Sequence, residues 1–174
     1  MKKRNWIFWI IAIIITIAAA YYQRKTGPTY PKKIITKIAD EKYEFILPTS
    51  HGGNEDCVIK LPVNNDHIEG RIWFKRYPTR ADWQSEKLIN ENDTLKAELP
   101  SQPPAGKLAY FIELHTDDGI VNIRKDSPVI VRFKGDVPVS ILLPHVILIF
   151  FAMLLSNLAG LMAMCTAPEL KEAK

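Results

Sequence analysis

The sequence has little cysteine and histidine, and it carries no signature of a known catalytic site. Cys57 and Cys165 are the only cysteines among 174 residues, and there are four histidines. His51-Gly52-Gly53 resembles the backbone oxyanion loop of esterases, but the Gly-x-Ser-x-Gly nucleophile elbow is missing. The hydrolase interpretation therefore fails, and these glycines are expected to let the chain turn with positive φ. We predict that the chain is not an enzyme.

Excess positive charge is also scarce once the chain is divided into segments. The formal net charge is +4, and Lys2, Lys3 and Arg4 supply three of these charges. Residues 23–138 hold 18 basic and 17 acidic side chains. Because a nucleic-acid interface needs a basic stripe interleaved with aromatic residues, and none is visible, we expect no nucleic-acid partner.

Two long uncharged segments are the dominant feature of the chain. No charged residue lies between Asp136 and Glu169, and none lies in residues 5–23. Both segments reach the length that a helix needs to cross a hydrocarbon core of roughly 30 Å. We predict a basic cap at 1–4, a first transmembrane helix at 5–23, an outer domain at 24–138, a second transmembrane helix at 139–165 and a tail at 166–174.

The ends of the first segment favour a retained anchor. Trp6 and Trp9 mark one end, and Tyr21 and Tyr22 mark the other, as expected for aromatic side chains at membrane interfaces. The competing interpretation is a signal peptide cleaved after the small residues 18–20. Because basic residues tend to stay inside, the sequence predicts a two-pass protein of a bacterial cytoplasmic membrane, with both termini cytoplasmic and the middle domain outside.

The middle block alternates apolar and polar residues in short runs, with almost no helical periodicity. This pattern predicts eight strands, at 34–38, 43–47, 58–63, 68–75, 95–99, 108–114, 120–124 and 129–133. Asp117-Asp118-Gly119 separates two of them as a hairpin turn. So many strands in a block of this length predict a mainly β fold, a sandwich of the immunoglobulin or fibronectin III type. Tyr110, near the start of a strand, fits either a tyrosine corner or an ordinary core position.

Three segments carry a resemblance to a known family. They are Ser-His-Gly-Gly-Asn-Glu-Asp-Cys at 50–57, Gln-Pro-Pro-Ala-Gly-Lys-Leu at 102–108, and Arg-Phe-Lys-Gly-Asp-Val-Pro at 132–138, which Pro144-His145 follows. The chain resembles an uncharacterised family of bacterial membrane proteins with an anchor, an Ig-like domain and a hydrophobic C-terminal part. The layout alone is similar to FixH and YtkA-like modules, which are linked to copper oxidase assembly. The second span departs from that layout.

His51, Cys57 and His115 form the candidate metal set. Thiolate and imidazole ligands suit copper or zinc, and a sandwich can bring loops from distant parts of the chain together. The spacing of these residues matches no metal motif, and Cys57 alternatively serves as a buried thiol or an intermolecular bridge. We therefore predict no cofactor, with copper or zinc as the alternative.

The aromatic residues Trp73, Phe74 and Tyr77, with Trp83, are candidates for a contact surface that binds a sugar or a peptide. Alternation along a strand sends Trp73 and Phe74 to opposite faces. One of the two is therefore expected in the core and the other at the surface, where exposed aromatic side chains tend to mark contact sites.

Small residues recur along both apolar segments and predict helix packing faces. The first face is expected to hold Ala12, Thr16 and Ala20, and the second Ala152, Ser156 and Gly160, with Asn157 turned toward a helix. The regular second helix is expected to begin near Pro144. These faces are expected to pack either within one chain or between copies. The sequence therefore predicts a membrane-anchored structural or interaction subunit of a larger assembly, with metal handling as the alternative role.

Overall fold

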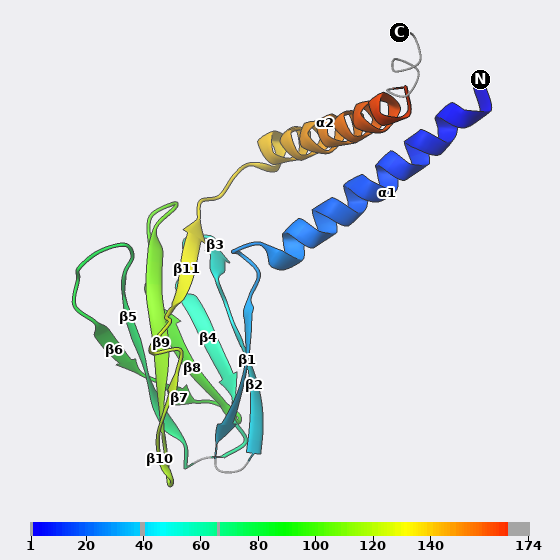
Figure 1. Ribbon diagram of the computed structural model, residues 1–174. Helices are drawn as coiled ribbons and strands as arrows, with labels where there is room; N and C mark the ends of the chain where they lie inside the picture. Colours follow the sequence, from blue (N-terminus) through cyan, green and yellow to red (C-terminus); the bar gives the residue numbers. More distant parts are fainter. Residues whose placement is uncertain (1, 39–40, 66, 167–174) are drawn as a thin grey trace. The chain divides into compact units, whose positions relative to one another are not determined.

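The computed structural model describes residues 2–38, 41–65 and 67–166, which form two compact units. One unit contains the two terminal helices and the other, Pro28–Asp136, is a β domain (Figure 1). The chain is mainly β, with two long apolar helices at its ends, as predicted. Met1 of the predicted cap and residues 167–174 of the predicted tail lie outside the described residues.

The two helices are α1 (Lys2–Thr26) and α2 (Val139–Thr166), and they run antiparallel (Figure 1). Their apolar portions, Trp6–Thr26 and Val139–Cys165, contain 21 and 27 residues. At 1.5 Å per residue these portions extend about 32 and 40 Å. Each is long enough to cross the roughly 30 Å core of a bilayer, as expected for a membrane protein.

The start of α2 agrees with the predicted span 139–165, but not with the expectation that the regular helix begins near Pro144. The helix begins at Val139, and Pro144 lies inside it. The backbone amides of Ile141 and Leu142 both bond the Pro138 carbonyl, at 2.9 and 3.0 Å. Pro144 removes only its own backbone donor from the helix, and the uncharged residues 139–143 before it form an additional helical turn. The expected start near Pro144 was therefore wrong by more than one turn.

The β domain contains every strand that alternation predicted, and three short strands that it did not. The bounds are β1 (Lys32–Ile38), β2 (Glu41–Leu47), β3 (Ser50–Gly52), β4 (Cys57–Pro62), β5 (Glu69–Arg76), β6 (Gln84–Lys87), β7 (Ile89–Asn90), β8 (Thr94–Leu99), β9 (Lys107–Thr116), β10 (Gly119–Ile123) and β11 (Val129–Lys134). Strands β3, β6 and β7 are the additions. They are too short or too polar to show a period of two.

The strands form a sandwich with immunoglobulin-type pairing. One sheet has the order β4-β8-β7, and the other has the order β3-β11-β9-β5-β6, with β10 also paired to β9. This order reproduces the B-E-D and C-F-G pairings of immunoglobulin domains. Strands β1 and β2 form a separate antiparallel hairpin, and the short β3 joins the second sheet by parallel pairing with β11.

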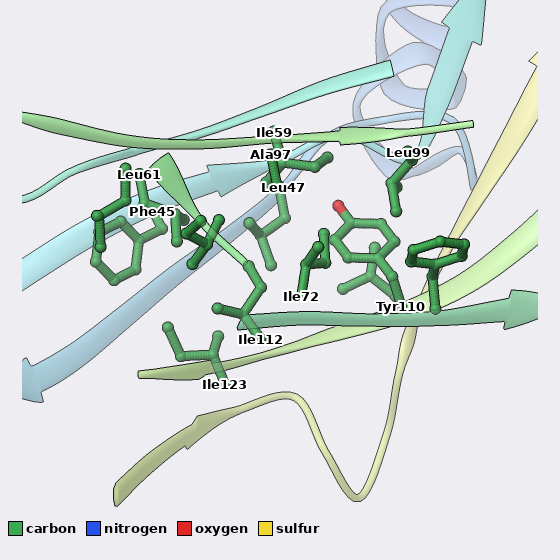
Figure 2. Close-up of a cluster of buried hydrophobic side chains, with 14 of the residues drawn as sticks. Phe45, Leu47, Ile59, Leu61, Ile72, Ala97, Leu99, Tyr110, Ile112 and Ile123 are labelled. Atoms are coloured by element: carbon green, nitrogen blue, oxygen red, sulfur yellow. The ribbon is translucent and has the colours of Figure 1, made fainter. Parts of the chain in front are cut away.

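Alternating side chains from the sheets fill the core between them. Figure 2 shows this cluster, with Phe45 from β2, Ile59 from β4, Ile72 from β5 and Tyr110 and Ile112 from β9. On β4, for example, burial alternates strictly along the strand. The predicted hairpin at the β9–β10 turn is also present, where Gly119 has φ +126°. The left-handed conformation explains the glycine at this position.

Tyr110 is a core residue and makes no tyrosine corner. Its side chain is fully buried, and its hydroxyl donates a hydrogen bond of 2.9 Å to the Pro48 carbonyl. In a tyrosine corner the acceptor lies only a few residues upstream of the tyrosine. Here the acceptor lies 62 residues upstream, where the chain passes from β2 to β3. The hydroxyl therefore ties β9, near its start, to the segment that joins β2 to β3.

Candidate contact site on the outer face of the β5–β9 sheet

The candidate site lies where β5 and β9 pair at the centre of the larger sheet. The antiparallel register places Trp73 opposite Phe111 and Arg71 opposite Glu113. Because alternate residues of a strand face opposite sides, the neighbours Ile72 and Ile112 belong to the core, and Trp73 and Phe111 belong to the outer face. The sheet itself therefore positions two aromatic rings side by side outside the core.

Three aromatic side chains, Trp73, Trp83 and Phe111, form what we call the aromatic cluster. The Trp73 and Phe111 rings are nearly parallel, at an interplanar angle of 7° and a centroid distance of 6.1 Å. The Trp83 ring meets Phe111 edge to face, at 4.9 Å and 74°. The Lys75 ammonium nitrogen lies 4.8 Å from the centroid of the Trp83 ring, a cation–π contact. Phe111 is buried by these neighbours, and both tryptophans are partly exposed.

Two surface hollows adjoin one another at the cluster. The aromatic hollow, of about 280 Å³, is lined by Trp73, Trp83, Phe111, Glu113 and Lys125. The polar hollow, also of about 280 Å³, is lined by Asn122, Arg124, Lys125, Asp126 and Ser127. Lys125 lines both of them. Together they present apolar rings beside hydrogen-bonding groups, which is the usual make-up of a binding site.

Two buried donors at these hollows have no hydrogen-bond partner among the residues that the structure describes. They are the indole nitrogen Nε1 of Trp73 and the guanidinium nitrogen Nε of Arg124. Another nitrogen of the same guanidinium, Nη2, donates to the Ser127 hydroxyl at 3.0 Å, and Arg124 has a φ of +66°. Buried N–H groups in proteins are almost always paired. One residue that lines each hollow therefore carries a buried donor that the described part of the chain leaves unpaired.

The acceptor side of the aromatic hollow comes from Glu113. Its carboxylate oxygen Oε1 lies 3.0 Å from His115 Nε2, and the Glu113 side chain is mostly covered. Lys125 is exposed and has no ion-pair partner within the described part of the chain. The site thus offers one carboxylate that is already held by a neighbour, and one free ammonium group.

The predicted contact aromatics occupy three different environments. Trp73 lies on the outer face and belongs to the aromatic cluster, whereas Phe74 is 8% exposed and belongs to the core. Tyr77 is 43% exposed and follows the end of β5, outside the residues that line the two hollows. Phe111 and Lys125 were absent from the sequence-based candidates. The β5–β9 register places Phe111 opposite Trp73, and Lys125, in the loop between β10 and β11, lines the same hollow as Trp73.

The predicted metal set does not form a cluster. His51 Nε2 lies 3.0 Å from the Glu55 carbonyl oxygen, and its ring contacts Phe133. Cys57 is 2% exposed in the core, and burial raises the pKa of its thiol to about 11. Residues 2–38, 41–65 and 67–166 contain no group of three His, Cys, Asp or Glu side chains suited to a metal ion. Copper or zinc binding stays a prediction without a geometric basis.

The two helices pack through only one of the two predicted small-residue faces. Ala12 and Thr16 of α1 are buried, Ala20 is partly buried, and Asn157 Nδ2 donates to Thr16 Oγ1 at 2.9 Å. On α2, the predicted stripe of Ala152, Ser156 and Gly160 is exposed instead. An added Cβ on Gly160 would meet no atom within 4 Å. The hydrogen bond fixes the rotation of α2, because a polar side chain between apolar helices turns toward its partner.

The fold and the helices define the chain as an immunoglobulin-like β-sandwich domain with an apolar helix at each end of the sequence. No protein-family model matches the sequence, and no curated protein matches it either. The resemblance to an uncharacterised membrane-protein family stays a prediction.

Proposed function

We propose that this chain is a membrane-anchored, non-enzymatic interaction module. The two apolar helices hold it in a bacterial cytoplasmic membrane with both termini inside, and the β domain lies outside. The support for this orientation is the basic cap at the start of the sequence, since basic residues favour the cytoplasmic side. Two antiparallel helices of spanning length support the two-pass arrangement.

The aromatic cluster is the observation that carries the interaction role. A sandwich of this kind buries its large apolar side chains between its sheets, but Trp73, Trp83 and Phe111 lie on an outer face beside Lys75. Exposed aromatic surface tends to mark contact and ligand-binding sites. The outer face of the β5–β9 sheet is therefore the contact surface that the domain presents.

The helices support membership of a larger membrane assembly. The stripe of Ala152, Ser156 and Gly160 is left uncovered by α1. Small residues allow close approach of another helix in lipid, where packing and interhelical hydrogen bonds drive association. A second copy of the chain or another membrane subunit fits this surface.

Site-specific photo-cross-linking of the full chain in its native membrane tests the contact surface. A photoreactive amino acid at position 83 lies in the aromatic cluster, and the same residue at exposed position 60 lies on β4, in the other sheet. We expect a discrete cross-linked product from position 83 and none from position 60. Equal yields from both positions, or no product from position 83, would refute the assignment of this face.

A further inference from the structure

The aromatic and polar hollows together define the chemistry of a ligand. We propose that they bind a saccharide that carries a carboxylate, with a sugar ring against the aromatic cluster and the carboxylate on Lys125. This inference rests on the proposed function, because it uses the same outer face of the domain. It goes beyond that function by naming the ligand class.

The size and lining of the aromatic hollow favour a single ring. Its volume of about 280 Å³ falls just below the range of about 300–1,000 Å³ that is usual for pockets of drug-sized ligands. Three aromatic side chains, Trp73, Trp83 and Phe111, supply apolar surface for the ring. The adjoining polar hollow has the same volume and leaves space for a neighbouring sugar unit.

The hydrogen-bonding groups favour a ligand that both donates and accepts. Trp73 Nε1 is a buried donor without a partner among the described residues, and Glu113 in the same hollow is an acceptor. A hydroxyl group can accept from the first and donate to the second. An apolar side chain from a protein partner would leave the indole N–H unpaired. A hydroxyl-bearing ring therefore satisfies the hollow better than an apolar anchor does.

The charges around the hollows select an anionic ligand over a cationic one. The Lys75 ammonium group already lies over the Trp83 ring, so it occupies the position that a cationic ligand would take on that ring. Lys125 lines both hollows and has no ion-pair partner among the described residues, and Arg124 has an unpaired Nε beside it. Of the acidic groups, Glu113 contacts His115. Asp126 has no ion-pair partner among the described residues either, but it lines only the polar hollow, so Glu113 is the one carboxylate in the aromatic hollow. A carboxylate is the group that a lysine and an arginine without acid partners bind best.

Binding measurements on the full chain in phospholipid nanodiscs test this proposal, because nanodiscs avoid detergents with sugar headgroups. The probes are oligomers of galacturonate and of glucuronate, and N-acetylmuramate, and maltotriose is the neutral control. We expect at least one acidic probe to bind and to change tryptophan fluorescence. Maltotriose should bind at least tenfold more weakly.

Matched variants locate the site. Trp83→Ala should abolish binding of the acidic probe, and Lys125→Gln should weaken it at least tenfold, to the level of maltotriose. The controls are Tyr77→Ala and Lys60→Gln, which remove an exposed aromatic ring and an exposed lysine outside the hollows and should leave binding unchanged. Circular dichroism of each variant checks that the β domain is folded.

Three results would overturn the proposal. They are the absence of binding by every acidic probe, equal binding of maltotriose, and equal binding of a glutamate oligopeptide, which would make the ligand a polypeptide. Equal loss in the control variants would move the site elsewhere and also overturn it. In each case a cross-linked product from position 83 would leave the proposed function standing, so the two failures can be told apart.

Discussion

The hydrogen bond from Tyr110 to Pro48 provides a sharp test of how the β domain is held together. The tyrosine is fully buried, and its hydroxyl lies 2.9 Å from the Pro48 carbonyl oxygen. Tyr110→Phe removes one hydroxyl and leaves the ring in place. The loss of a buried hydrogen bond, with an acceptor left unpaired, costs about 1–2 kcal/mol. For a domain of this size, that cost lowers Tm by about 4–10 °C.

Cys57 supplies the assay for this variant, because its thiol is buried in the same core. In a Cys165→Ser background, a maleimide should modify the remaining thiol only when the β domain opens. Tyr110→Phe should shift the temperature of modification downward, and Tyr77→Phe, at an exposed ring, should not shift it. An unchanged Tm for Tyr110→Phe would refute the structural role of the hydroxyl.

Three further predictions concern the core and the helix pair. Gly70→Ala places a Cβ within 2.7 Å of two leucine side chains and 3.0 Å from a backbone oxygen, so overpacking should lower the free energy of unfolding by about 1–3 kcal/mol. The control is Gly52→Ala, whose Cβ meets no atom within 4 Å and which should leave chemical denaturation unchanged. Asn157→Ala and Thr16→Ala should show a coupling free energy of about 0.6–1.7 kcal/mol in a double-mutant cycle on helix association, and zero coupling would contradict the hydrogen bond. Burial raises the pKa of Cys57 from 9.0 to about 11, so the folded domain keeps a proton that the unfolded chain loses, and stability should fall by about 2 kcal/mol between pH 9 and 11. The Cys57→Ala variant should show a flatter pH dependence of unfolding, and an identical slope would contradict this assignment.

Local patterning was sufficient to predict the main strands of the domain. Alternation along β4 and β8, and a turn such as Asp117-Asp118-Gly119, depend on neighbouring residues and are therefore visible in the sequence. Strand β3 has only three residues, and it pairs in parallel with β11, which lies far along the chain. No local pattern marks such a strand.

The candidate site was predictable only in part, because it depends on pairing between segments that are distant in the sequence. Alternation predicted that Trp73 and Phe74 face opposite sides of the sheet, but it could not choose between them. That Phe111 lies opposite Trp73 follows from the β5–β9 register, which the core on the other face fixes. The neighbourhood of Lys125 depends on how the chain passes from β10 to β11.

The helix pair shows the limit of composition as a guide to packing. Small residues predicted a face on each helix, and the face with Ala12 and Thr16 is buried. On α2, Asn157 turns toward α1 and donates to Thr16, and Ser156, one residue away, turns outward. The small-residue pattern alone therefore did not predict which face of α2 packs against α1.

The proposed topology is tested most directly by finding the side of the membrane on which the β domain lies. A cysteine at the exposed position 52, introduced as Gly52→Cys in the Cys165→Ser background, can be labelled with a membrane-impermeant maleimide, because Cys57 is buried. We expect labelling in intact spheroplasts before any permeabilisation. Labelling that occurs only after permeabilisation would place the β domain in the cytoplasm and refute the proposed topology.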